Sequence, residues 1–294
     1  MQAKYWSIII AMAFNNNENA TRPLFGTAGT PISSPSRQTQ DGIRRVRELG
    51  LDALEVEFVR GVRMSEETAR ETARVAEELN VSLSVHAPYY VNLNGNPEVV
   101  KSSIQRIEDS CRVGAILGAT VIVVHAAYYG KTRDSDAATN AVVGALQKVE
   151  NHGVRIGLET MGRHSQWGTV DEIITAAEQC DNNNVVPVVD WAHIHARSGG
   201  GLRTLDDFRK VYERIAAWNK AYAKRLHSHF SGVMFTEKSG ERNHLTIDSR
   251  SPDYAPLAKL IKSERICPTM ISESPNIEGD AILFKKMWND AVVT

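Results

Sequence analysis

Eight short apolar segments, each followed by a long amphipathic stretch, constrain the fold of this 294-residue chain more than any other feature. Most are rich in Val, Ile and Leu without strict alternation, which is typical of strands buried on both faces of a parallel sheet. Strand–helix alternation repeated eight times predicts an α/β protein with a single (β/α)8 TIM barrel; a doubly wound sheet, with about six strands, is the alternative. The predicted strands cover residues 23–29, 51–58, 81–86, 119–125, 154–159, 185–190, 224–229 and 268–273.

The stretches between these strands have the spacing of apolar residues and the end signals of helices. Ser65, for example, is an expected N-cap, and Gly50 is placed where a helix ends. The predicted helices cover residues 36–50, 65–80, 98–118, 135–153, 169–180, 202–222, 252–263 and 278–292.

The amino-terminal residues do not fit this repeat. Residues 5–14 are apolar but too short to cross a bilayer, which needs about 20 residues, and they resemble a signal peptide only faintly. The composition of residues 15–22 is typical of a polar linker. We therefore expect residues 1–22 to be an extension outside the fold and residues 23–294 to form the barrel. We also expect a cytoplasmic monomer without a membrane partner.

Charge and cysteine content exclude several classes of protein. The net charge is −1, which argues against binding nucleic acid by bulk positive charge, so any basic track must be local. The three cysteines are widely spaced and contain no CxxC pair, so neither a disulfide framework nor a thiolate zinc site is expected. Cys111, Cys180 and Cys267 are predicted to be reduced thiols.

Six consecutive predicted strands deliver a metal-binding side chain to their carboxyl ends. In a barrel these ends meet at one rim, where active sites lie. Burying six such residues without partners would cost folding free energy, so the set predicts a divalent metal site. Imidazole with carboxylate suits Zn²⁺, Mn²⁺ or iron better than Mg²⁺ or Ca²⁺, and six ligands exceed the needs of one ion. The residues are His86, His125, Glu159, Asp190, His227 and Glu273.

Two further histidines extend this set. His193 follows Asp190 by three residues, on the expected loop after the sixth strand, and His244 lies on the expected long loop after the seventh. Together they predict a third metal position beside two others, whereas His195 has no assigned role. Two metals about 3.5–4 Å apart are a common device for displacement at phosphorus.

Seven stretches together resemble endonuclease IV, the metal-dependent apurinic/apyrimidinic endonuclease family, and most closely its archaeal-type branch. The resemblance covers the chain from about residue 23 to its end. The stretches are SVHAPYYVNL (84–93), VVHAAYY (123–129), GLETMGR (157–163), VVDWAHIHA (188–196), LHSHFSG (226–232), GERNHL (240–245) and ISE (271–273).

The resemblance implies a TIM barrel with two or three Zn²⁺ ions that cuts double-stranded DNA 5′ of abasic sites and leaves a 3′-hydroxyl. A metal-bridging hydroxide would attack phosphorus. His86 and His125 would bind the first metal, and Glu159, also the catalytic residue, would bridge it to the second. Asp190, His227 and Glu273 would complete the second metal, and His193 and His244 would bind the third. Mn²⁺ is an alternative ion.

The chain departs from the family pattern at one position. The family usually has an Asp two residues before the last histidine, but this sequence has Arg242 there, preceded by Glu241. Glu241 is the substitute ligand expected from its longer side chain. The resemblance also implies that Tyr89 and Tyr90 enter the DNA duplex, since ring faces stack on bases, and that Arg63 enters beside them.

Two other interpretations remain open. A sugar isomerase or epimerase of the same barrel superfamily shares the ligands of strands five to eight and uses one divalent metal, but does not need His86, His125 or His244. The other interpretation is a metal- or DNA-binding protein that keeps the fold of an enzyme but has lost its activity. Arg242 alone supports it. Metal content separates the interpretations, since two or three ions favour the nuclease.

Overall fold

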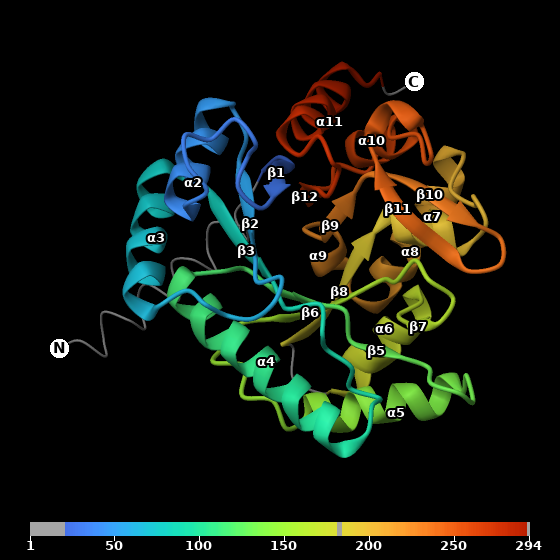
Figure 1. The fold of residues 1–294 in the computed structure, drawn as a ribbon. Helices are drawn as coiled ribbons and strands as arrows, with labels where there is room; N and C mark the ends of the chain where they lie inside the picture. The colour runs from blue at the N-terminus through green and yellow to red at the C-terminus, as the bar shows by residue number, and fades with distance from the viewer. Residues whose placement is uncertain (1–20, 181–183, 293–294) are drawn as a thin grey trace.

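The computed structural model describes residues 21–180 and 184–292, and these form the predicted barrel. Eight parallel strands close in the order β1-β12-β9-β8-β6-β4-β3-β2, with helices around them (Figure 1). The barrel strands are β1 (Leu24–Ala28), β2 (Ala53–Glu57), β3 (Ser82–His86), β4 (Ile122–Val124), β6 (Ile156–Glu159), β8 (Val185–Asp190), β9 (His227–Phe230) and β12 (Thr269–Ser272).

The helices of the outer ring follow the predicted stretches, most of them with shorter ends, and the predicted helix 202–222 is divided into two helices. Asn96 caps α4 by accepting a hydrogen bond from the backbone N–H of Val99, and the helix ends at Gly118, whose φ of 68° is readily adopted by glycine. The helices are α2 (Thr39–Glu48), α3 (Glu66–Leu79), α4 (Pro97–Leu117), α5 (Ser135–Leu146), α6 (Val170–Gln179), α8 (Leu205–Trp218), α9 (Lys220–Ala223), α10 (Ala255–Ser263) and α11 (Glu278–Asp290).

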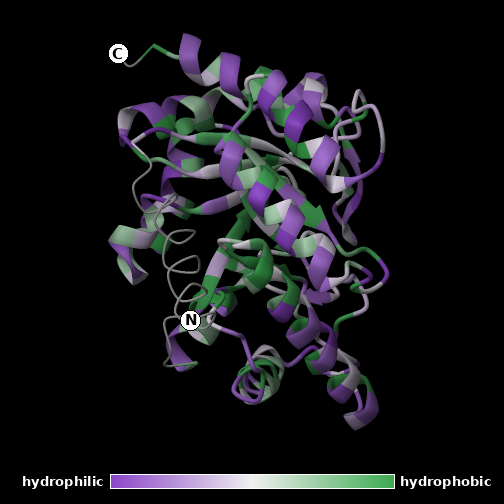
Figure 2. Ribbon diagram, turned by 90° about the vertical axis from the view of Figure 1, so that its left-hand side faces the viewer, coloured by the Kyte–Doolittle hydropathy of each residue, from purple (hydrophilic) through white to green (hydrophobic). Residues whose placement is uncertain are grey.

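The apolar core lies between the strands and the surrounding helices. Figure 2 shows hydrophobic residues concentrated in the strands and hydrophilic ones on the helices. Phe25, Ile43, Trp167 and Phe284 are among the fully buried side chains. This burial rigidly fixes the strand ends that carry the polar residues. None of the helices in the described part of the chain is long and apolar enough to cross a membrane.

Two segments predicted as loops are regular elements. Trp191–Arg197 forms the short helix α7, because the side chain of Asp190 accepts a hydrogen bond from the backbone N–H of His193 and so caps it. The segment after β9 is a hairpin of β10 (Gly232–Thr236) and β11 (Gly240–Leu245), which packs beside α7 (Figure 1). His193 is therefore on a helix and His244 on a strand. A second small ladder pairs β5 (Ala127–Tyr128) with β7 (Gln166–Trp167).

One contact spans the predicted amino-terminal boundary. Residues 1–20 lie outside the described residues, but Arg22, assigned to the extension, contacts the barrel. Its guanidinium lies 2.7 Å from a carboxylate oxygen of Asp52, which precedes β2. Contacts of the barrel thus begin at least one residue before the predicted start.

Candidate metal centre

The carboxyl ends of β3, β4 and β6 bring together the first group of ligand-type side chains. Nε2 of His125 lies 2.6 Å from Oε2 of Glu159, and Nε2 of His86 lies 3.4 Å from the same oxygen. Neither contact is a hydrogen bond, and all three atoms are buried without a hydrogen-bond partner. Atoms that converge in this way suit a shared cation. The ligand atoms of His86, His125 and Glu159, which the family resemblance assigns to one metal, lie within 4.8 Å of one another.

Glu159 also belongs to a second group, as predicted, but one member of that group differs. The ligand atoms of Glu159, Asp190, His229 and Glu273 lie within 4.8 Å of one another. His229, rather than the predicted His227, occupies this position: its Nδ1 lies 3.2 Å from oxygens of both Glu159 and Glu273.

The reason for this correction is the extent of β9. The strand continues to Phe230, and its register places His229 opposite Asp190. Side chains two residues apart on a strand share a face, so His227 points the same way but lies about 7 Å further from the rim. There its Nε2 is 2.9 Å from Glu55 Oε2 on β2.

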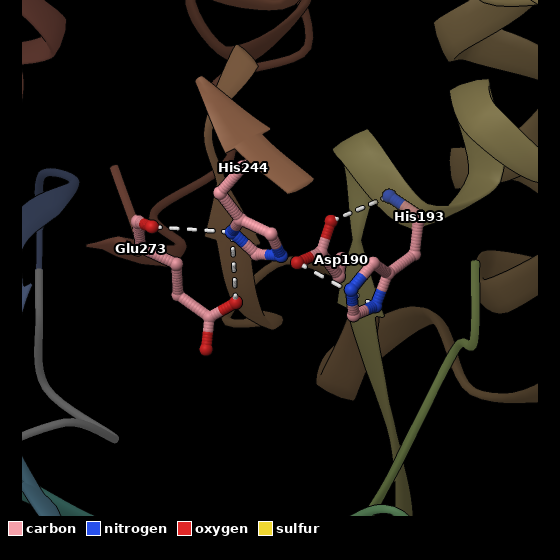
Figure 3. A group of neighbouring side chains, drawn as sticks. All are labelled: Asp190, His193, His244 and Glu273. Carbon is pink, nitrogen blue, oxygen red and sulfur yellow. Dashed lines mark hydrogen bonds and ion pairs between the residues drawn. The ribbon is translucent and has the colours of Figure 1, made fainter. Parts of the chain in front are cut away.

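The third group joins α7 to the β10–β11 hairpin. Ligand atoms of Asp190, His193, His244 and Glu273 lie within 4.8 Å of one another, and Figure 3 shows these side chains facing a common space. Glu241 lies beside them, with one carboxylate oxygen 3.4 Å from His193 Nε2 and the other 3.8 Å from His244 Nε2.

A β-bulge accounts for the unusual sequence spacing in this group. Phe235 pairs with Glu241 and Met234 pairs with Asn243, so Arg242 is the extra residue. Residues three apart on a regular strand face opposite sides, but the bulge places Glu241 and His244 on the same side. Arg242 itself is exposed. Glu241, rather than Arg242, is therefore the residue of this segment that faces the ligand histidines.

Gly162, in the loop after β6, permits the close approach of this third group. A Cβ atom on Gly162 would lie 2.7 Å from Glu241 Cβ and 3.0 Å from His193 Cδ2. These distances are shorter than normal carbon–carbon contacts, so a larger residue would push both side chains away. The sequence offered no sign of this requirement, because it depends on three separate segments.

Backbone carbonyls orient three of the histidines. The Nδ1–H of His86 donates to Ala87 O at 2.8 Å, that of His193 to Thr160 O at 2.8 Å, and that of His244 to Glu273 O at 3.1 Å. Nε2 of His86 therefore faces Glu159, and Nε2 of His193 and of His244 faces Glu241, while Nδ1 of His193 also lies 3.3 Å from Glu159 Oε1. Histidines that bind metals are commonly fixed by a hydrogen bond from the other nitrogen, so this arrangement fits metal ligands.

Burial and mutual repulsion strongly shift the pKa values of the carboxyl groups. Desolvation raises the pKa of Glu273 to about 8, and it raises the pKa of Glu57, at the end of β2, also to about 8. Burial alone would raise the pKa of Glu159 as well, but the charges of His125 and His229 hold it well below its ordinary value. So many acidic groups in one place favour a bound cation.

A cavity of about 580 Å³ opens above the three groups. His125, His193, His244 and Glu273 line its floor side, and Tyr89 and Arg163 line its walls. Tyr89 packs its ring 5.4 Å from that of His86, whereas Tyr90 is 63% exposed. Arg63 lies apart from the ligands, at a second hollow of about 420 Å³ that shares Glu57 and Val59 with the first.

A family model describing the xylose isomerase-like TIM barrel matches residues 43–287 of this sequence. The chain belongs to this family. Its relatives include an uncharacterized protein of Methanocaldococcus jannaschii, 35% identical over 91% of this chain and 97% of that protein. A probable endonuclease 4 of Mycobacterium leprae is 25% identical over 50% of this chain and 60% of the relative.

Several solved structures resemble the barrel at low sequence identity. A D-tagatose 3-epimerase-like protein has a TM-score of 0.70 and 18% identity, covering 91% of this chain and 96% of that one. Endonuclease IV from Thermus thermophilus has a TM-score of 0.66 and 17% identity, covering 90% of this chain and all of that one. These similarities show the fold, and the chemistry has to be argued from the site.

Proposed function

We propose that this protein is a metal-dependent DNA repair hydrolase that cuts the phosphodiester 5′ of abasic sites and leaves a 3′-hydroxyl. The observation that carries the proposal is the presence of three adjoining ligand groups at the rim, two of which share Glu159; a fourth group, of Glu55, His227 and His229, lies deeper in the barrel. Displacement at phosphorus commonly uses two or more ions, whereas a sugar isomerase with one ion needs only the second group. His86, His125 and His244 would then have no function.

The side chains suggest how ions are distributed among the groups. His86, His125 and Glu159 would hold the first ion, with Glu159 bridging to the second beside Asp190, His229 and Glu273. His193, His244 and Glu241 would hold the third. Histidine nitrogens with carboxylates favour Zn²⁺, or Mn²⁺ as the next choice. Ions bound there would supply Lewis acidity toward a phosphate and acidify the attacking water.

The surroundings of the cavity support a nucleic-acid substrate. Tyr89 and Tyr90 lie on the loop after β3 with 45% and 63% of their surfaces exposed, which leaves part of each side chain accessible for contact with bases. Arg163 on the cavity wall and Arg63 at the neighbouring hollow are positioned to meet phosphates. Arg197 is not available for this role, because its guanidinium donates to the carbonyls of Arg163 and Gln166.

The test uses a duplex with one tetrahydrofuran abasic analogue and a 5′ label. Protein loaded with Zn²⁺ is expected to nick this duplex, leave an unmodified duplex intact, and lose activity after prolonged chelation. Glu159→Gln is the control for a contaminating nuclease. Tyr89→Ala with Tyr90→Ala should weaken binding without changing metal content. An uncut abasic duplex, with protein in excess and metal content verified, would refute the proposal.

One observation favours a second candidate, a sugar isomerase or epimerase with one divalent ion at the second group. Glu57 lines the cavity, and its Oε1 is buried without a hydrogen-bond partner. Such an oxygen suits a sugar hydroxyl, and it repels a phosphate when ionised. Isomerisation of a panel of ketoses by protein carrying one Mn²⁺ would favour this candidate, especially if Glu57→Gln abolished it.

A further inference from the structure

His229 differs from the other oriented histidines of the metal centre in what lies behind it. His86, His193 and His244 each donate Nδ1–H to a backbone carbonyl. In His229, Nδ1 faces Glu159 and Glu273, and Nε2, on the far side of the ring, lies 2.9 Å from Oε1 of Glu55. A carboxylate from β2 therefore takes the place of a carbonyl.

Glu55 is itself firmly held beneath the centre. It is fully buried, and its other oxygen, Oε2, accepts a hydrogen bond from Ser84 Oγ at 2.7 Å and contacts His227 Nε2 at 2.9 Å. These two partners fix Oε2, and so orient Oε1 toward His229. The contact with His229 is an ion pair by distance and is not in line with a ring N–H, so its effect is mainly electrostatic.

We propose that Glu55 is a positioning residue that fixes His229 with Nδ1 toward the second metal position and increases the basicity of that nitrogen. This inference rests on the proposed metal centre and does not depend on the substrate being DNA. A carboxylate behind a ligand histidine commonly changes metal affinity by about 10- to 100-fold. No sequence pattern indicates this role, since Glu55 lies within a buried strand remote from the recognised motifs.

The experiment measures Zn²⁺ affinity and stoichiometry of the full chain by competition with a chelator, and the absorption spectrum with Co²⁺. Glu55→Ala should lower the affinity for one equivalent of Zn²⁺ by roughly 10- to 100-fold and change the Co²⁺ spectrum. Glu55→Gln keeps the shape but not the charge, so a smaller loss, about 10-fold, is expected. His227→Gln retains a donor toward Glu55 and should stay within about threefold of wild type.

Asp52→Asn is the matched control, since Asp52 is a buried carboxylate three residues earlier in the chain, just before the first residue of β2. It should lower stability and leave Zn²⁺ affinity unchanged. Thermal unfolding of the metal-free variants shows whether each variant is still folded. A loss of Zn²⁺ affinity in a folded variant can then be attributed to the metal site. Unchanged affinity in Glu55→Ala would overturn the inference. So would loss of one whole equivalent in both Glu55→Gln and His227→Gln, since Glu55 would then bind an ion itself.

The two proposals fail differently. Wild-type protein that binds metal and ignores abasic DNA refutes the nuclease, while the effects of Glu55 on Zn²⁺ affinity remain. Wild-type protein that cuts abasic DNA, with Zn²⁺ affinity and the Co²⁺ spectrum unaffected by Glu55→Ala, leaves the nuclease standing and removes the positioning role.

Discussion

Buried carboxylates at the two ends of this barrel have different kinds of partners. At the amino-terminal end, Asp52 is 4% exposed and has two cations from the chain: Arg22 at 2.7 Å and Lys285 at 3.1 Å. At the carboxyl end, within residues 21–180 and 184–292, the ion pairs of Glu159 and Glu273 are all with histidines.

This difference in partners indicates a different role for the carboxylates at each end. A lysine or arginine neutralises a carboxylate permanently, which serves stability and leaves the carboxylate unavailable for chemistry. Histidines neutralise it only when protonated, and as neutral rings they offer lone pairs to a metal. The carboxylates at the carboxyl end therefore suit a cation taken up from solution. At the amino-terminal end the chain itself already supplies the cations. Four predictions test this contrast, from the largest effect to the smallest.

Glu159→Gln should have the largest effect, because Glu159 is common to the first two ligand groups. Loss of its charge should reduce incision of abasic DNA by about 10²–10³-fold or more. It should also remove the stabilisation that metal gives, which amounts to about 4 kcal/mol for a ligand at a thousand times its Kd. Denaturant unfolding with and without Zn²⁺ measures the second effect.

The counterpart at the other end is Asp52→Asn, for which Zn²⁺ should stabilise the variant as much as wild type. If the metal-dependent stabilisation disappears in Asp52→Asn as well, or persists in Glu159→Gln, the two ends are not functionally separate.

His229→Gln compared with His227→Gln gives the second prediction. The two histidines share a face of β9, but only His229 lies among Glu159, Asp190 and Glu273. His229→Gln should weaken one metal by about 100-fold, while His227→Gln should have little effect on affinity. Metal analysis after dialysis against a weak chelator separates them. Equal losses would mean that His227 also serves the centre directly.

The strand ends could be predicted from the sequence because six of the eight predicted strands combine an apolar run with a terminal His, Asp or Glu. That pattern placed His86, His125 and Glu159 at one rim, and only the family resemblance assigned them to one metal; their ligand atoms lie within 4.8 Å of one another. It could not choose between His227 and His229, since both lie on one face and only the pairing with β8 and β12 fixes where β9 ends.

Other features depended on contacts between distant segments. The helix α7 has only seven residues, too few for a clear helical period, and the residue that starts it, Asp190, is predicted from the sequence as a metal ligand alone. The bulge at Arg242 exists only in relation to β10. Glu55 and Glu57 were hidden within a strand, because their partners come from β3 and β9 or from the cavity.

Gly162→Ala gives the third prediction and tests the third ligand group. The added methyl group would meet Glu241 and His193 at 2.7–3.0 Å, so the two side chains must separate. We expect a loss of about 1–2 kcal/mol in unfolding free energy and weaker binding of one metal, with the other two unaffected. Titration of Zn²⁺ into metal-free protein resolves the steps.

Gly144→Ala is the matched control, since a Cβ there meets nothing within 4 Å and the residue lies in α5. Alanine should stabilise this helix by about 0.5–1 kcal/mol and leave all metals in place. Three unchanged binding steps in Gly162→Ala would show that Glu241 and His193 do not act together on an ion.

Asp52→Asn gives the smallest effect, and its dependence on pH identifies its cause. Burial by itself would raise the pKa of Asp52, but hydrogen bonds and charges from Arg22 and Lys285 lower it below its usual value. A carboxyl with a lowered pKa in the folded state stabilises the fold above its unfolded pKa of about 3.9, and this contribution is lost as the pH falls through the folded value. Because Arg22 is half exposed, we expect a difference of only about 1 kcal/mol at pH 7. The difference between wild type and Asp52→Asn, measured by urea unfolding of metal-free protein, should stay constant from pH 7 to 5 and shrink below pH 4. A difference that grows toward acid would mean that Asp52 is held neutral, like the raised carboxyls at the other end, and the contrast between the two ends would not stand.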